Sequence, residues 1–432
     1  MRELETLSLD RTLRDAARDI DRRTATQEPL AETLPKVLFD EETLAWLREL
    51  RGKDPLAEAL ERWLLRVREH AQLEARRAEL TRAHRIQLHA IVEPEQTRLS
   101  LSDQLRLSLA RPQQRAAYLR SYFASSADLA ELVSRLWEER QLFADQLGAP
   151  LDSFELASTA LAPTARNFLA ETRAAYETLD VRDPERLVTV LLAESAEQGW
   201  PARLSLRTVS ELLPDPSWLT GLRLRPFSLP VARSGSSFLL ALAGLGRAVA
   251  DAASAARSPF VLARDVFDLE RQRVGALFGL LPISATFTER RLGAGSSQAR
   301  DHLRALARAV LADARVAAFR VLLRELLAAG TGAVRRELAE LSHGALGFEL
   351  PREVAGAFIR VRPRDSQRFA GLLLAASRQE ALVEAHDDDW FRNPRAIREI
   401  RAELDEPRAS NPSADALSAG LEAFRARIEP LL

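Results

Sequence analysis

The sequence predicts a large all-α protein, bilobed, with a minor β element near residues 203–232. Helix-start signals recur along the whole 432-residue chain. Apolar residues follow them at spacings of three and four, which place them on one buried helix face. We expect roughly fifteen such helices. No fixed repeat period is present, which argues against a solenoid.

The helix starts are set by capping side chains, which accept hydrogen bonds from the first free N–H groups of a helix. Asp40, Asp54, Asp183 and Asn393 are such residues, and proline at the first helical position follows the last three. The apolar residues that follow at helical spacing are Leu44, Leu47 and Leu50, then Leu56, Leu60, Trp63 and Leu64, then Leu187 and Val190, and finally Ile397, Ile400 and Leu404. The segment 301–328 shows the same spacing and predicts a long helix.

Two segments depart from this pattern and suggest a division of the chain. Residues 1–35 are polar and only patchily periodic, so we expect a loosely held N-terminal arm. The segment 200–233 holds five prolines and alternates apolar with charged residues over 222–225, which is typical of a short strand. We therefore predict an arm at 1–35, an N-terminal helical lobe at 36–200 and a C-terminal lobe at 201–432.

The composition excludes several classes of function. The chain carries 61 basic and 62 acidic residues, a formal net charge of −1, so we expect no nucleic-acid partner. It has no cysteine, which excludes disulfides, thiolate metal sites and cysteine nucleophiles. No secretion signal and no run of roughly 20 apolar residues is found. We therefore expect a cytoplasmic protein with no membrane partner.

Three groups of residues are candidates for binding chemistry, each with a structural alternative. The six histidines include no pair four residues apart, the spacing that suits one metal, so we expect exposed or hydrogen-bonded helix histidines. Residues 293–297 are rich in glycine and serine and could hold a phosphate, although a flexible loop is favoured. Asp387, Asp388 and Asp389 could bind a cation, although solvated residues before a helix are favoured.

A fourth group, between residues 229 and 282, resembles the M3/M2-type zinc oligopeptidases, which are gluzincins. In that family a helix carries H-E-x-G-H-A, and a glutamate on a later helix is the third zinc ligand. Here the helix reads Ala243-Gly244-Leu245-Gly246-Arg247-Ala248. The resemblance places Ala243 at the first histidine, Gly244 at the catalytic glutamate and Arg247 at the second histidine. Glu270, on the next long helix, corresponds to the third ligand within one residue.

The resemblance implies a neurolysin-like helical architecture, with a cleft lined by helices at 236–254 and 267–280. It also implies the loss of catalysis, because alanine has no ligand atom, glycine has no carboxylate and arginine stays cationic. We therefore expect no zinc, no other cofactor and no enzymatic activity. An ion pair between Arg247 and Glu270 is predicted to replace the metal's charge.

Three functions remain open from the sequence. The first is an inactive peptidase homologue that binds a peptide ligand or an active paralogous peptidase subunit. The second is a helical scaffold unrelated to peptidases, in which 238–250 is a core helix whose glycines permit close packing. The third is an active enzyme whose catalytic residues the sequence does not reveal.

Overall fold

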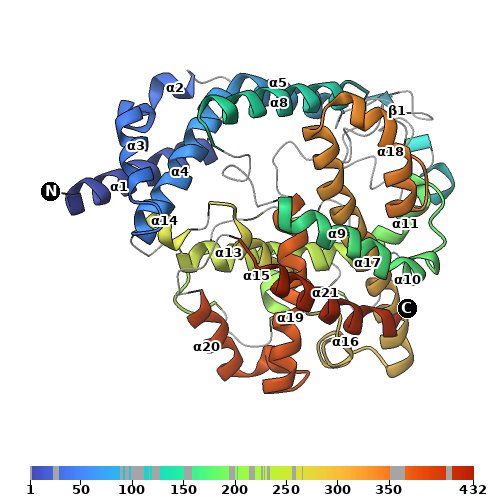
Figure 1. Ribbon diagram of the computed structural model, residues 1–432. Coiled ribbons are helices and arrows are strands. Elements are labelled where there is room, and N and C mark those ends of the chain that lie inside the picture. The colour runs from blue at the N-terminus through green and yellow to red at the C-terminus, as the bar shows by residue number, and fades with distance from the viewer. Residues whose placement is uncertain are drawn as a thin grey trace.

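The chain folds into an all-α protein, as the sequence predicts (Figure 1). This computed structural model describes all residues except 1, 23–28, 88–90, 93–96, 99–110, 116, 119–126, 150–157, 194–199, 202, 214–218, 225–226, 228, 231–233, 255–258, 265, 351–364 and 405–410. The first half contains α1 (Arg2–Arg22), α2 (Leu30–Thr33), α3 (Glu41–Glu49), α4 (Pro55–Gln72), α5 (Glu74–Gln87), α8 (Ala127–Gln146), α9 (Ser158–Glu171), α10 (Arg173–Glu177), α11 (Pro184–Leu192) and α12 (Leu206–Glu211). The second half contains α13 (Gly235–Ser254), α14 (Phe260–Ala263), α15 (Leu269–Gly279), α16 (Ala285–Leu292), α17 (Ser296–Ala328), α18 (Thr331–Leu346), α19 (Asp365–His386), α20 (Pro394–Glu403) and α21 (Ala414–Ile428).

The four predicted helix caps are confirmed. Asp40 accepts from the backbone N–H groups of Glu42 and Thr43, at the start of α3. Asp54 and Asp183 cap α4 and α11, and Asn393 caps α20, in each case directly before a proline at the first helical position. These local signals therefore fix where four of the helices begin.

The C-terminal half is built as a stack of helices around α17. Helix α13 packs on α15, α15 packs on α19, and α19 packs on α21. The 33-residue α17 contacts α9, α11, α18 and α19, and forms a hairpin with α18 (Figure 1). Its buried face includes Leu306, Phe319 and Leu323, so the longest helix forms the centre of the core.

The N-terminal segment is not loosely held over Arg2–Arg22, which form helix α1. Leu9 and Leu13 are buried, and α1 packs on α4 and α14. The Asp10 carboxylate accepts hydrogen bonds from the backbone N–H groups of Phe260 and Val261, at 3.0 and 2.9 Å. These contacts tie α1 to a part of the chain beyond residue 201. The division into an arm and two lobes stays a prediction.

The described residues contain one minor β element, and it lies outside the segment 203–232. Its two short strands, β1 (Ile91–Val92) and β2 (Thr97–Arg98), pair antiparallel. Within the described part of 203–232 there is instead a helix, α12, started by a capping box between Ser205 and Thr208. The alternation at 222–224 has no strand partner among the described residues. Capping at Ser205 and proline's missing N–H both work against a sheet in this segment.

One described helix has the length and apolar character to cross a membrane, the Gly235–Ala253 part of α13. An 18-residue part of that stretch is 67% buried by the rest of the chain. This is the pattern of a core helix. Its apolar character is explained by packing against α15 and α12.

Candidate functional site

The four residues singled out by the resemblance lie on the neighbouring helices α13 and α15. Ala243, Gly244 and Arg247 are on α13, and Glu270 is in the first turn of α15. The two helices pack directly against each other, as the resemblance predicts for the site helices. They are in contact along 243–247 and 274–279, so no cleft separates them over these residues.

Missing side chains make this close approach possible. A Cβ atom on Gly246 would lie 2.6 Å from the carbonyl oxygen of Val274 and 2.9 Å from Cβ of Phe278. A Cβ atom on Gly244 would lie 2.8 Å from the ring of Phe227, on the other side of α13. All three distances are shorter than ordinary van der Waals contact. The small residues of α13 thus have a packing role, which is what the alternative interpretation of 238–250 requires.

Arg247 extends across α15 at Gly275. A Cβ atom on Gly275 would lie 2.7 Å from Cγ of Arg247 and 3.0 Å from the carbonyl oxygen of Ala243. Gly275 is therefore the residue of α15 that faces the Arg247 side chain. Gly279 lies against the side chain of Ala243, where a Cβ atom would be 3.2 Å from Cβ of Ala243. Glu270 lies five residues before Gly275, about 7.5 Å along the helix axis at 1.5 Å per residue. The family resemblance thus places the third ligand at Glu270, more than one helical turn from Gly275, the residue of α15 against Arg247.

The carboxylate of Glu270 is paired with Arg273, one turn along the same helix. Arg273 donates from Nε to Oε2 of Glu270 at 2.9 Å and from Nη2 to Oε1 at 2.6 Å. The same Nη2 donates to Oε2 of Glu403, on α20, at 2.9 Å. The cation that we expected Arg247 to supply to Glu270 is thus provided by Arg273. The pair between Arg247 and Glu270 stays a prediction.

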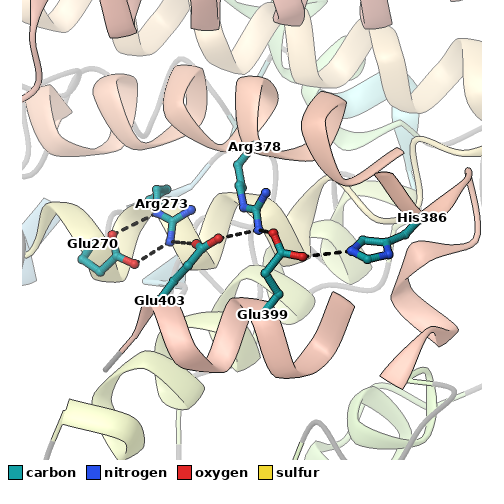
Figure 2. Close-up of polar contacts among 6 residues, drawn as sticks. All are labelled: Glu270, Arg273, Arg378, His386, Glu399 and Glu403. Atoms are coloured by element: carbon teal, nitrogen blue, oxygen red, sulfur yellow. Dashed lines mark hydrogen bonds and ion pairs between the residues drawn. The ribbon is translucent and has the colours of Figure 1, made fainter. Parts of the chain in front are cut away.

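These groups belong to a continuous chain of ion pairs that joins α15, α20 and α19 (Figure 2). Beyond Glu403 the chain passes to Arg378, which also donates to Oε1 of Glu399 at 2.6 Å. Nε2 of His386 lies 2.9 Å from Oε2 of Glu399 and ends the chain. Acidic and basic groups alternate throughout, so each carboxylate has a cationic or histidine neighbour. Such a chain fixes how the three helices pack.

The surroundings shift the pKa of two members of this chain. Burial would lower the pKa of Arg273, but hydrogen bonds and charge from Glu270 and Glu403 outweigh it and raise the pKa. For Glu399, the hydrogen bond from His386, followed by the one from Arg378, lowers the pKa of the carboxyl. Both shifts stabilise the charged forms. At Arg273 and Glu399 the network therefore favours the charged forms that hold it together.

Few signals of this network can be detected in the sequence. They are the spacing of three between Glu270 and Arg273 and of four between Glu399 and Glu403. Neither spacing indicates that residues from three helices meet. Arg273 is the residue that pairs with Glu270, the network member that belongs to the predicted site. The side chain of Arg273 is only 5% exposed.

The side chains at the predicted site do not fit a zinc ion. Ala243 and Gly244 offer no donor atom, and a guanidinium such as that of Arg247 does not coordinate metals. Gly275, the facing residue, adds none. Within the described ranges, no cluster of three or more histidine, aspartate or glutamate residues could hold a metal.

The other sequence candidates have structural roles. Gly293, with φ of 67°, follows the end of α16, and Gly295 is the N-cap of α17, so 293–295 connect the two helices and Ser296 and Ser297 form the first turn of α17. Asp388 accepts from Oγ of Ser284 at 2.8 Å, and Asp389 pairs with Arg290 at 2.8 Å. Both aspartates therefore tie the end of α19 to α16.

Of the histidines, two are informative. His386 is a hydrogen-bonded helix histidine, as expected. His302 is buried within α17, and neither ring nitrogen has a hydrogen-bond partner among the described residues. His302 is thus neither exposed nor hydrogen-bonded to a described residue, whereas the sequence predicts that the histidines are one or the other.

Comparison with known proteins places the fold. No protein-family model matches the sequence, and no curated protein is significantly similar to it. Among solved structures, the apo-Mg structure of a carboxypeptidase from Pyrococcus furiosus is similar, with a TM-score of 0.58 and 11% sequence identity. The similarity covers 99% of this chain and 98% of the carboxypeptidase. At this identity the likeness concerns the fold alone, and it shows that the chain has an all-α architecture like that of the carboxypeptidase.

Proposed function

We propose that this protein is a catalytically inactive homologue of helical metallopeptidases that binds a peptide or a partner protein. The observation that carries the proposal is the combination of a peptidase-like fold with Ala243, Gly244 and Arg247 on α13. In the resembled family these positions supply two zinc ligands and the carboxylate that activates water. An alanine, a glycine and an arginine perform neither role.

Binding is the function that such a fold retains when its catalytic groups are absent. A partner is either a peptide or an active paralogous peptidase subunit, because both are recognised by surfaces that do not depend on the metal. The fixed charge of Arg247 near α15 also disfavours a divalent cation at this place, since like charges repel. The chain's own residues thus support binding without a hydrolytic step.

The first test is metal content combined with activity. The purified chain is incubated with zinc, dialysed, and analysed for bound metal by mass spectrometry. It is then assayed against N-blocked dipeptides and a mixture of synthetic oligopeptides. We expect far less than one zinc per chain and no cleavage. About one zinc per chain, together with cleavage that a chelator abolishes, would overturn the proposal.

A matched variant separates trace contamination from a weak intrinsic activity. Arg247→Ala removes the side chain nearest the predicted metal position, whereas Arg182→Ala changes an arginine whose side chain is 80% exposed. Activity from a contaminating peptidase would be the same in both preparations. Activity that changes only in Arg247→Ala would belong to this protein and would contradict its assignment as inactive.

A further inference from the structure

A groove of about 470 Å³ opens between three helices on the C-terminal side of the molecule. Helix α17 forms its floor, and α9 and α18 form its walls. Leu169, Leu322, Leu326 and Leu341 line it, and the last two are only half-buried. The volume lies within the range of ordinary ligand sites. None of the residues near the α13–α15 contact lines this groove.

The two rims of the groove carry opposite charge. Arg166 and Arg173 lie on the α9–α10 side, with side chains 61% and 69% exposed. Glu337 and Glu340 lie on the α18 side, where the side chain of Glu337 is 53% exposed. Arg173 also pairs with Glu177 at 3.2 Å, but an exposed pair of this kind is weak and easily rearranged. Both rims are therefore accessible to a partner.

A buried arginine outside the groove links residues of its two walls. Arg315 donates to the carbonyl oxygens of Leu169, Gly344 and Ala345 and to Oγ1 of Thr172, at 2.7–2.9 Å. It thereby holds the end of α9 against the end of α18. The groove is a preformed feature whose walls are fixed by these hydrogen bonds. Preformed sites bind with a smaller loss of conformational entropy.

On the floor of the groove, Glu325 of α17 lies between the rims. Nη2 of Arg166 donates to its Oε2 at 2.7 Å. Burial nonetheless raises the pKa of the Glu325 carboxyl, with the charge and hydrogen bond of Arg166 acting against it. The groove floor is thus a partly desolvated surface, on which apolar contacts are effective.

We infer that this groove docks one amphipathic helix of a partner protein, with an apolar stripe flanked by one acidic and one basic edge. The inference rests on the proposed function and names its partner surface. The acidic edge would face Arg166 and Arg173, and the basic edge would face Glu337 and Glu340. Apolar residues at positions i, i+4 and i+7 would lie on the leucine floor.

A helix fits the groove better than an extended peptide for a reason of hydrogen bonding. The walls and floor are helices, whose backbone groups are already bonded within each helix, and Arg315 occupies the carbonyl oxygens of Gly344 and Ala345. An extended peptide would therefore find no backbone partners in the groove. A helix satisfies its own backbone groups and presents side chains alone.

The test uses three fluorescein-labelled, stapled helices of about 18 residues, or five turns. All carry the same leucine stripe. The first has glutamate along one edge and lysine along the other, the second has glutamate on both edges, and the third has lysine on both. Exchanging the two edges of the first peptide is not a useful control, because reversing the direction of the bound helix restores the match. Binding is measured by fluorescence anisotropy.

We expect the wild-type protein to bind the helix with two different edges about tenfold more tightly than either other helix. Arg166→Glu combined with Arg173→Glu should shift the preference to the all-lysine helix. Glu337→Lys combined with Glu340→Lys should shift it to the all-glutamate helix. These four side chains are surface residues, so the variants should fold normally.

Two further variants test the apolar lining and the specificity of the effect. Leu341→Arg places a charge on the apolar part of the α18 wall, beside the floor, and should abolish binding of all three helices. Arg207→Glu is the matched control, because this arginine on α12 has a side chain that is 87% exposed and lies outside the groove. It should bind like the wild type.

Several outcomes would overturn the inference. These are equal binding of the three helices, no binding of the first up to millimolar concentration, and unchanged preference in both rim variants. Sedimentation showing that the wild type self-associates and that Leu341→Arg is monomeric would assign the groove to a second copy of the chain. Zinc-dependent cleavage would overturn the proposed function instead, and it would leave the anisotropy result standing.

Discussion

Replacing Gly246 by alanine tests whether α13 and α15 are held by close packing of small residues. The new Cβ would lie 2.6 Å from the carbonyl oxygen of Val274 and 2.9 Å from Cβ of Phe278. The carbonyl belongs to the backbone of α15, so relief requires the two helices to move apart. Overpacking of this kind costs about 1–3 kcal/mol, and we expect the upper end for two buried helices. Alanine returns about 1 kcal/mol of helix propensity, which leaves a net loss of about 2 kcal/mol.

Gly344→Ala is the matched control, because this glycine of α18 has no atom within 4 Å of the position of a Cβ. It should raise the free energy of unfolding by about 0.5–1 kcal/mol through propensity alone. Urea unfolding followed by circular dichroism gives both values if the slopes agree. Equal midpoints for the two variants would refute the packing argument, because they would show that α13 and α15 separate without loss of stability.

The ion network and the buried histidine give two further predictions. Arg273→Met should lower the free energy of unfolding by about 3 kcal/mol in urea unfolding, because it removes the buried cation shared by Glu270 and Glu403, while Glu403 keeps its pair with Arg378; Arg207→Met, at an exposed pair, should change it little, and equal losses would contradict the network. Burial lowers the pKa of His302 below its ordinary value of 6.5, and the charge of Asp301 acts against this shift. As the pH falls, the histidine is therefore protonated in the unfolded chain before it is protonated in the folded one. The free energy of unfolding should thus decrease as the pH drops below 6.5. His302→Leu should remove this part of the pH dependence in unfolding experiments between pH 5 and 8, and an unchanged profile would refute it.

The elements that the sequence predicted well are those set by local chemistry. Asp54 followed by proline begins α4 because a capping carboxylate and a fixed φ angle act within one turn. No strand lies among the described residues of 203–232, because alternation alone does not supply a neighbouring strand. Ser205 and Thr208 form a capping box there, a signal that the sequence contains and that outweighs the alternation.

The site was predictable in outline and not in register. The resemblance brought the helices of Arg247 and Glu270 together, and the structure places them side by side. It did not reveal that Gly275 faces Arg247, because the register of two packed helices depends on which side chains fit between them. Nor did it indicate that Arg273 neutralises Glu270, since its spacing of three is common on exposed helices.

Arg247 and Gly275 are a matched pair across the two helices. Any side chain at position 275 would meet the stem of Arg247, because even a Cβ would lie 2.7 Å from its Cγ. Conversely, a glutamate facing α13, as a third metal ligand must, has no room at this register while Arg247 is present. Positions 243, 244, 247 and 275 thus carry no side chain that coordinates metals, and the residues at 247 and 275 depend on each other through packing. Restoring histidines on α13 alone would leave glycine as the facing residue, so the ligand set would stay incomplete.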